Sequence, residues 1–162
     1  MQASADIRAI LDKAHIHYEV LEHPPAFTAM EIAEAQHIVG QQVIKAVIVK
    51  VDGKLGMCVL PAIHVIDFAK LKAALKAKDV HLETESKVAM LFPTYEVGAM
   101  PPFGHLAGLT VYLDKSLEEN DTVAFNAGSH REMLRIKFKD YLRLVKPTLI
   151  DFGMHISHRS EP

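Results

Sequence analysis

Cysteine is almost missing from this chain of 162 residues, in which Cys58 is the single example. One cysteine excludes an internal disulfide. Cys58 stands in the apolar run MCVL (residues 57–60), where a buried and unreactive thiol is expected, because a catalytic cysteine needs an electropositive and partly open surrounding. The cysteine usage fits a reducing compartment, and we expect the protein in the cytoplasm.

Long apolar stretches and a dominant charge are missing as well. No segment approaches the roughly 20 apolar residues that a membrane-spanning helix needs, and residues 1–8 lack the basic head and apolar core of a secretory signal. The formal net charge is only −2. A protein that grips a long nucleic-acid duplex neutralises many phosphates, so the charge argues against that class, but it permits a few contacts to a single-stranded end.

Several signatures of common chemistry are also absent. The sequence has no Gly-x-Gly-x-x-Gly or phosphate-loop pattern, which argues against a nucleotide-binding doubly wound fold. The histidine pairs at 15 and 17 and at 155 and 158 have no partners at metal-site spacing, so no metal and no cofactor is expected. No nucleophile elbow and no evident carboxylate couple occur, so neither a serine triad nor a paired-acid mechanism is indicated.

The patterns that are present predict an α+β protein with a mixed sheet, because helices and strands follow one another without strict alternation. Asp52-Gly53 separates two apolar runs and is the strongest hairpin signal in the chain. Asp67 is expected to cap a helix that carries Phe68, Leu71 and Leu75 on one face. Helices are expected from Ser4 and over residues 28–40, 86–91 and 139–144, and strands over 17–21, 44–51, 54–60, 80–82, 109–113, 122–125 and 133–138. We expect one domain over residues 1–146 and a loosely held tail over residues 147–162.

Three features could carry chemistry, and each also has an ordinary explanation. Lys45 alternates with Val47 and Val49 on a predicted strand; it either meets a cavity or an anion, or it extends to water from the strand end. The loop GAMPPFG (residues 98–104) could present rigid backbone donors to an oxyanion, or it could be a structural turn. His130, in the polar turn NAGSH (residues 126–130), could act in acid–base chemistry or be an ordinary surface histidine.

Four segments in this order resemble one known family. They are EHPPAFT (residues 22–28), IKAVIV (44–49), EVGAMPPFG (96–104) and NAGSH (126–130). Each motif is weak by itself, but their order and spacing over about residues 7–145 resemble the YbaK/prolyl-tRNA synthetase-associated domain family. The resemblance implies a mixed, barrel-like β-sheet surrounded by helices. It also implies hydrolysis of the ester that joins a wrongly attached amino acid to a transfer RNA, by a free-standing, trans-acting protein.

The resemblance also implies roles for particular residues. Lys45 matches a lysine expected to contact the terminal nucleotide of the transfer RNA, residues 98–102 match a Gly-x-x-x-Pro loop that holds the aminoacyl group, and Gly128 and His130 match a Gly-x-His turn beside the amino-acid pocket. The implied mechanism has no protein nucleophile: a water, positioned with help from a ribose hydroxyl of the substrate, attacks the ester. The residues expected to be catalytic are Lys45, Gly98 and His130, and those expected to bind substrate are Phe27, Thr28, Ala99, Met100, Pro101, Pro102, Gly128 and Ser129.

The expected partner is the acceptor end of an aminoacyl-tRNA, with transient contact to an aminoacyl-tRNA synthetase and none with a membrane. Phe27, Met100 and Phe103 are candidate walls of a pocket for a small amino acid such as alanine. Two other functions stay open from the sequence: a non-catalytic tRNA-binding module of the same fold, and a general nucleic-acid-binding protein. A salt titration of binding separates the last from an enzyme, because a backbone binder shows a steep dependence.

Overall fold

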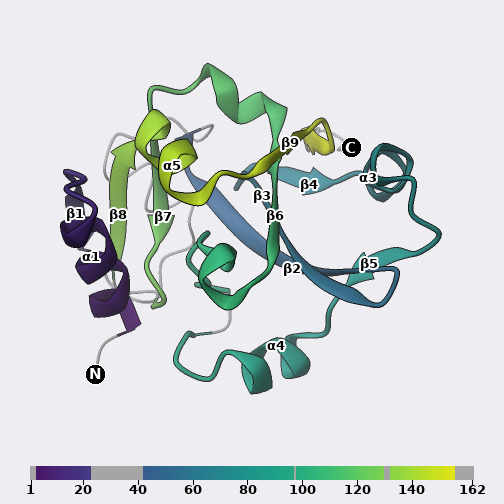
Figure 1. Ribbon diagram of the computed structural model, residues 1–162, viewed down its shortest axis with the longest axis horizontal. Coiled ribbons are helices and arrows are strands. Elements are labelled where there is room, and N and C mark those ends of the chain that lie inside the picture. Colours follow the sequence, from purple (N-terminus) through teal and green to yellow (C-terminus); the bar gives the residue numbers. More distant parts are fainter. Residues whose placement is uncertain (1–2, 23–41, 97, 130–131, 156–162) are drawn as a thin grey trace, which may run out of the picture.

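A computed structural model describes residues 3–22, 42–96, 98–129 and 132–155 (Figure 1). The predicted helix over residues 28–40 lies outside these ranges. Within the described part of the chain, no helix is both long and apolar enough to cross a membrane. In chain order, the elements are α1 (Ala3–Lys13), β1 (Glu19–Glu22), β2 (Ile44–Val51), β3 (Lys54–Pro61), β4 (His64–Ile66), α3 (Phe68–Leu75), β5 (Val80–Leu82), α4 (Glu85–Leu91), η2 (Gly104–Ala107), β6 (Thr110–Asp114), η3 (Lys115–Glu119), β7 (Thr122–Asn126), β8 (Glu132–Lys137), α5 (Phe138–Val145), β9 (Thr148–Ile150) and β10 (Gly153–His155).

The largest sheet has the strand order β5-β2-β3-β6-β9 and is mixed. β2 and β3 form the predicted hairpin, and both turn residues have positive φ, 47° at Asp52 and 86° at Gly53. Positive φ at both central positions matches the twist of the two flanking strands, which explains why Asp-Gly is found there. β3 pairs with β6, and β6 pairs with β9, in parallel. The predicted α+β class with a mixed sheet is therefore confirmed.

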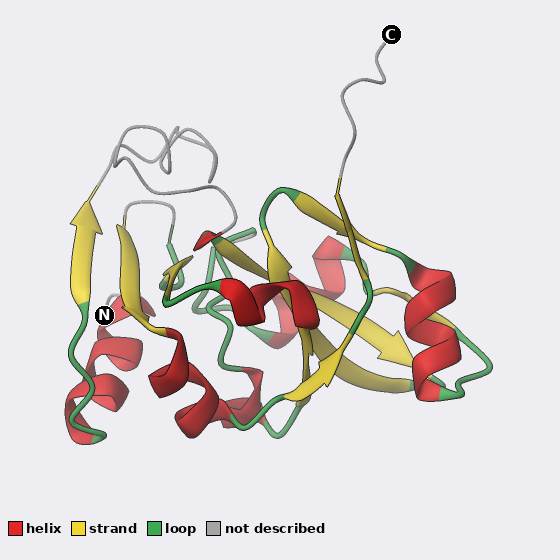
Figure 2. Ribbon diagram, turned by 90° about the horizontal axis from the view of Figure 1, so that it is seen from above, coloured by secondary structure: helices red, strands yellow, loops and turns green. Residues whose placement is uncertain are grey.

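A second sheet, β1-β8-β7, stands beside the first, and β4 pairs with β10 in a third. One isolated parallel bridge, between Val43 and Ala124, connects the start of β2 to β7. The described strands thus divide among three sheets and do not close a barrel, so the barrel-like arrangement implied by the resemblance is reached only in part. Figures 1 and 2 place α1 and α3 at opposite ends of the molecule.

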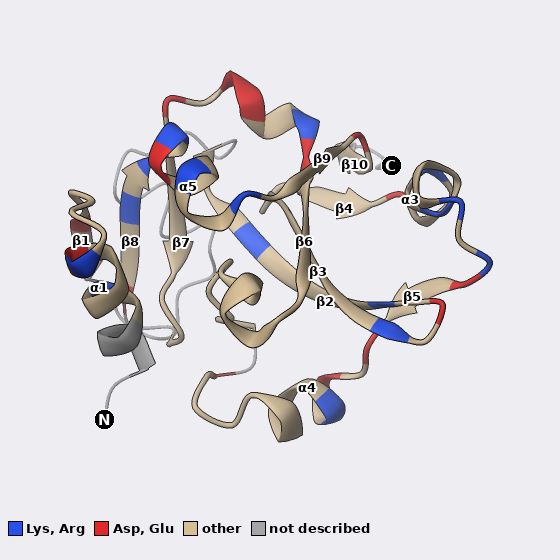
Figure 3. Cartoon of the chain, viewed as in Figure 1, with Lys and Arg blue, Asp and Glu red and all other residues tan. Residues whose placement is uncertain are grey.

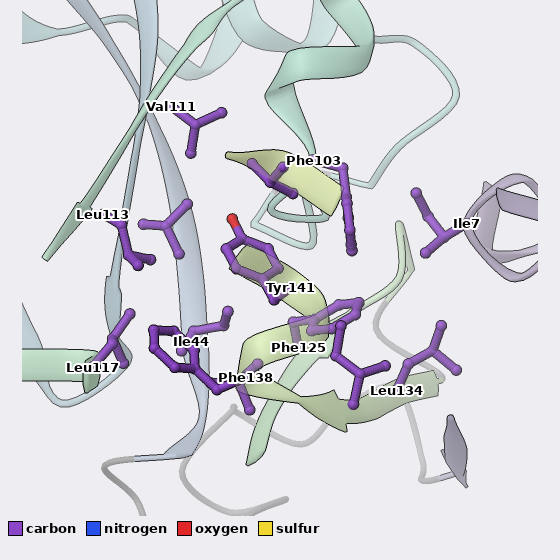
Figure 4. Packing of buried hydrophobic residues seen from close by; sticks show 14 of the residues in the cluster. Ile7, Ile44, Phe103, Val111, Leu113, Leu117, Phe125, Leu134, Phe138 and Tyr141 are labelled. Carbon is purple, nitrogen blue, oxygen red and sulfur yellow. The ribbon is translucent and has the colours of Figure 1, made fainter. Parts of the chain in front are cut away.

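The main hydrophobic core fills the space between the two larger sheets and is rich in aromatic side chains (Figure 4). Phe103 packs edge-on against both Phe125 and Tyr141, with ring centroids 5.2 and 5.6 Å apart. α1 adds Ile7 and Leu11, which are fully buried, as its helical spacing predicts. The Phe103 side chain therefore anchors its loop in the hydrophobic core.

A second core lies between the other face of the large sheet and α3, and it contains Cys58. Burial raises the pKa of the Cys58 thiol to about 12, so the expectation of an inert thiol agrees with its surroundings. Asp67 caps α3 by accepting a hydrogen bond from the Lys70 backbone N–H at 3.1 Å, as predicted.

The C-terminal segment is more ordered than the sequence led us to expect. β9 extends the large sheet, β10 pairs with β4, and Phe152 between them is fully buried in the second core. The expectation of a loosely held tail was therefore wrong for residues 148–155. The physical reason is that β9 and β10 are only three residues long and gain their stability from partners distant in sequence, which leaves no local pattern to detect.

Candidate active site

The loop that begins at Gly98 combines an exposed start with a rigid anchor. Gly98 is exposed and has φ 84°, a conformation that favours glycine. Ala99, Pro101 and Pro102 are buried, and the Tyr141 hydroxyl donates a 2.6 Å hydrogen bond to the Pro102 carbonyl inside the core. The side chains of these three predicted substrate-binding residues thus hold the loop in place, and the exposed backbone at Gly98 faces away from the core.

The turn after β7 is fastened to this loop. The backbone N–H of Glu96 donates a 2.9 Å hydrogen bond to the carbonyl of Gly128. Gly128 is buried with φ 106°, and Ser129 beside it is partly buried. The structure therefore brings together two of the predicted segments. His130, Phe27 and Thr28 lie outside the described residues.

Lys45 is the second residue of β2, where it pairs with Leu60 of β3. It is partly buried, and burial lowers the pKa of its ammonium group. Lys45 forms no ion pair with any carboxylate of the described residues. A partly desolvated cation with no anionic partner in the described part of the protein is suited to bind an anionic ligand.

His64 is a neighbour of Lys45 that the sequence analysis did not single out. It is buried, and its Nδ1 lies 3.9 Å from the Asp114 carboxylate without forming a hydrogen bond. Burial lowers the pKa of His64 more than the Asp114 charge raises it, and His155 and Lys45 lower it further. Burial therefore favours the neutral form of the His64 imidazole, and the Lys45 ammonium is one of the charges that act on it.

Two cavities adjoin the Gly98 loop. One of about 210 Å³ lies between β2, α4 and the loop, and its walls include Ala46, Ile48, Val88, Gly98 and Met100. The other, of about 130 Å³, is lined by Met57, Met100, Phe103 and neighbouring apolar residues. Met100 lines both cavities and Phe103 lines the smaller one, while their role as walls of an amino-acid pocket stays a prediction. A larger cavity of about 360 Å³ near the start of α5 contains none of the predicted site residues.

The predicted residues do not all face the same space. Ala46 and Ile48 turn toward the main core, whereas Lys45 and Val47 alternate with them on the opposite side of β2. The 210 Å³ cavity is lined from both sets, because Val47 borders it together with Ala46 and Ile48. On that opposite side, Val43 packs with Ala124 of β7, and β7 leads directly to the Gly128 turn. Val43, two residues before Lys45, therefore joins this end of β2 to the strand that leads to the Gly128 turn. No group of three or more side chains suited to a metal ion occurs within the ranges that the structure describes.

The amino-acid sequence of this chain is similar to those of known proteins. The chain is 28% identical over 149 residues to the multifunctional Ser/Thr-tRNA deacylase ProXp-y of Escherichia coli K12, covering 89% of each chain. It is 29% identical over 107 residues to a proline–tRNA ligase of Halalkalibacterium halodurans, which spans 66% of this chain and 18% of the ligase.

Solved structures agree on the fold. A proposed trans-editing enzyme for prolyl tRNA synthetase superposes with a TM-score of 0.82 at 22% identity, over 95% of this chain and 98% of the other. The family model for the aminoacyl-tRNA editing domain matches residues 23–144, which include Lys45, Gly98 and Gly128. The chain belongs to the aminoacyl-tRNA editing domain family.

Proposed function

We propose that this protein is an aminoacyl-tRNA deacylase that hydrolyses the ester between a wrongly attached amino acid and the terminal ribose of a transfer RNA. The observation that carries the proposal is Lys45, a partly buried cation without an ion-pair partner among the described residues of a chain that belongs to an editing family. A free-standing relative with 89% coverage is itself named a deacylase. The site is proposed to lie within residues 1–146.

The proposed reaction needs no protein nucleophile. A water molecule attacks the ester carbonyl, the bond from the carbonyl carbon to the ribose oxygen breaks, and that oxygen takes a proton, which leaves a free amino acid and a ribose hydroxyl. The backbone N–H of Gly98 stabilises the developing oxyanion, because the buried prolines and the Tyr141 hydrogen bond fix the loop before substrate arrives. The N–H of the next residue, Ala99, already donates to the Glu96 carbonyl at 3.0 Å. Lys45 holds the anionic acceptor end, and His130 orients the aminoacyl group.

The amino acid removed is proposed to be small. The 210 Å³ cavity beside Gly98 and Met100 has room for a small or medium side chain, and its walls, which are mainly apolar but include Glu83 and Glu85, exclude larger groups by contact. From the sequence we expect alanine, while the Escherichia coli relative is named for serine and threonine. A cavity of this kind separates near-isosteres by only about 1–3 kcal/mol, so a panel of esters is needed to rank them.

The proposed partner is the acceptor end of a transfer RNA, with a transient contact to a synthetase, in the cytoplasm. Figure 3 shows acidic and basic positions interspersed over the described elements, and the net charge is −2. This distribution favours a few contacts to one end of the nucleic acid over a long electrostatic footprint.

Deacylation of a panel of mischarged transfer RNAs tests the proposal. We expect wild-type protein to hydrolyse at least one small-amino-acid ester, and Lys45→Ala to lower kcat/KM by about 10- to 100-fold, the value of one charge-assisted contact. Lys50→Ala is the matched control on the same strand, since Lys50 lies 3.9 Å from Glu83 and should change the rate little. Transfer-RNA binding without hydrolysis of any ester would instead favour the non-catalytic binding module.

A further inference from the structure

Asn126, at the end of β7, has a buried amide oxygen without a hydrogen-bond partner among the described residues. Buried polar atoms in folded proteins are nearly always paired, and the exceptions are often found where a ligand completes the hydrogen bond. Asn126 as a whole is only partly buried, so the side chain is accessible from one side. The amide oxygen of Asn126 is therefore available to accept a hydrogen bond from a ligand.

The bridge between Val43 and Ala124 puts Asn126 and Lys45 on the same face of their strands. Val43 and Ala124 form a parallel bridge and pack in the same small cluster, so their side chains share one face. Lys45 and Asn126 each follow this bridge by two residues, and period-two alternation keeps them on that face. Beyond the bridge β2 and β7 diverge (Figure 1). Lys45 and the unpaired amide therefore lie on these two diverging strands, and a ligand as large as a nucleotide can contact both.

The charge of Lys45 and the neutral amide of Asn126 indicate which ligand group donates the hydrogen bond to Asn126. A carboxylate at position 126 would place a negative charge on the same face as Lys45 and weaken the attraction of this face for an anion. A neutral amide leaves the lysine charge free for an anionic group and offers one acceptor to a neutral hydroxyl. Two residues later, the Gly128 carbonyl accepts a hydrogen bond from the Glu96 N–H, so the turn that follows Asn126 is held against the segment just before Gly98.

The geometry points to Asn126 as a substrate-binding residue that accepts a hydrogen bond from the free hydroxyl of the terminal ribose. This inference rests on the proposed function. The ribose hydroxyl is the substrate group expected to help position the attacking water, so fixing its orientation would favour attack on the ester carbonyl. Asn126 would thus contribute to the preference for a terminal ribose with a free hydroxyl, as well as to the rate of ester hydrolysis.

The test uses non-hydrolysable 3′-amide analogues of aminoacyl-tRNA whose terminal ribose carries either a 2′-hydroxyl or a 2′-hydrogen. We expect Asn126→Ala to weaken binding of the hydroxyl analogue by roughly five- to tenfold, the effect of one hydrogen bond, and to leave the deoxy analogue unchanged. Asn120→Ala is the matched control, because Asn120 follows η3 and precedes β7, whereas Asn126 is the last residue of β7. Equal losses on both analogues, or no loss, would overturn the assignment.

Two further variants keep the inference testable if Asn126→Ala folds poorly. Asn126→Ser retains a small acceptor and should lose less affinity for the hydroxyl analogue, whereas Asn126→Asp should lose more, because its carboxylate repels the anionic acceptor end. The reverse order would contradict the role. The proposed function fails separately: in that case the wild-type protein neither binds the hydroxyl analogue nor hydrolyses any ester.

Discussion

At the scale of single residues, Asp114 joins parts of the chain that the sequence keeps apart. Its side chain is 1% exposed and accepts hydrogen bonds from the backbone N–H groups of Phe152 at 2.9 Å and Gly153 at 2.6 Å. It also accepts one from the Ser116 backbone N–H at 3.3 Å, at the start of η3. A buried carboxylate with several donors fixes the position of the C-terminal strands.

Replacement of Asp114 by alanine is expected to lower the free energy of unfolding by about 2–4 kcal/mol, because it leaves buried N–H groups unpaired. Urea denaturation followed by circular dichroism measures this loss. Asp151→Ala is the matched control: Asp151 forms an exposed ion pair with Lys70 at 3.2 Å and should cost less than about 1 kcal/mol. Similar losses for both variants would show that Asp114 does not hold the C-terminal strands in place.

Lys45 could be found from the sequence because a lysine within an apolar alternation is a local signal. Asp114 could not, because an aspartate after a short strand looks like an ordinary surface residue, and its partners Phe152 and Gly153 follow 38 and 39 positions later. Asn126 lies within a motif that the sequence analysis singled out, but its unpaired oxygen is visible only once the neighbouring strands are in place.

At the scale of elements, those with their own local sequence signals could be predicted, and those that depend on distant partners could not. The β2–β3 hairpin has its own turn residues, and the helix after Asp67 has its own cap, so both follow from local sequence. β4 and β10 are three residues long and form only with each other, across a wide gap in sequence. The link between the Gly98 loop and the Gly128 turn is likewise a long-range backbone contact.

The hydrogen bond from Tyr141 to the Pro102 carbonyl anchors the Gly98 loop, so its loss should affect both stability and rate. We expect Tyr141→Phe to lower the free energy of unfolding by about 1–3 kcal/mol and kcat by roughly tenfold, because the loop amides lose their fixed position. Tyr112→Phe, on β6, is the control for removing a phenolic hydroxyl from a partly buried site. A loss of stability with unchanged kcat would show that the Tyr141 hydrogen bond stabilises the fold but does not contribute to catalysis.

At the scale of the whole molecule, the C-terminal strands complete the second core. Phe152 and Ile150 are buried together with Cys58, Leu60 and Leu71, which come from β3 and α3. This core lies on the face of the large sheet opposite to the aromatic cluster. The stability of the sheet therefore depends on residues beyond position 146, where the sequence suggested that the domain ends.

Truncation after residue 146 should destabilise the protein by at least about 3 kcal/mol, because it removes two buried apolar side chains and the edge strand β9. Truncation after residue 155 retains every C-terminal contact described above and serves as the control. Thermal unfolding of the two shortened proteins measures the difference. Equal melting temperatures would show that residues 147–155 contribute no stability.

The parallel pairing of β6 with β9 has a consequence for synthesis on the ribosome. β9 is the last strand of the large sheet along the chain, so β6 emerges with an open edge and keeps it while roughly 35 further residues are added, for a few seconds at about 5–20 residues per second. An open parallel edge is a template for strands of other chains. Yield in a host is therefore expected to depend on how quickly the final segment is translated, and a tag fused close behind β10 would prolong the vulnerable interval.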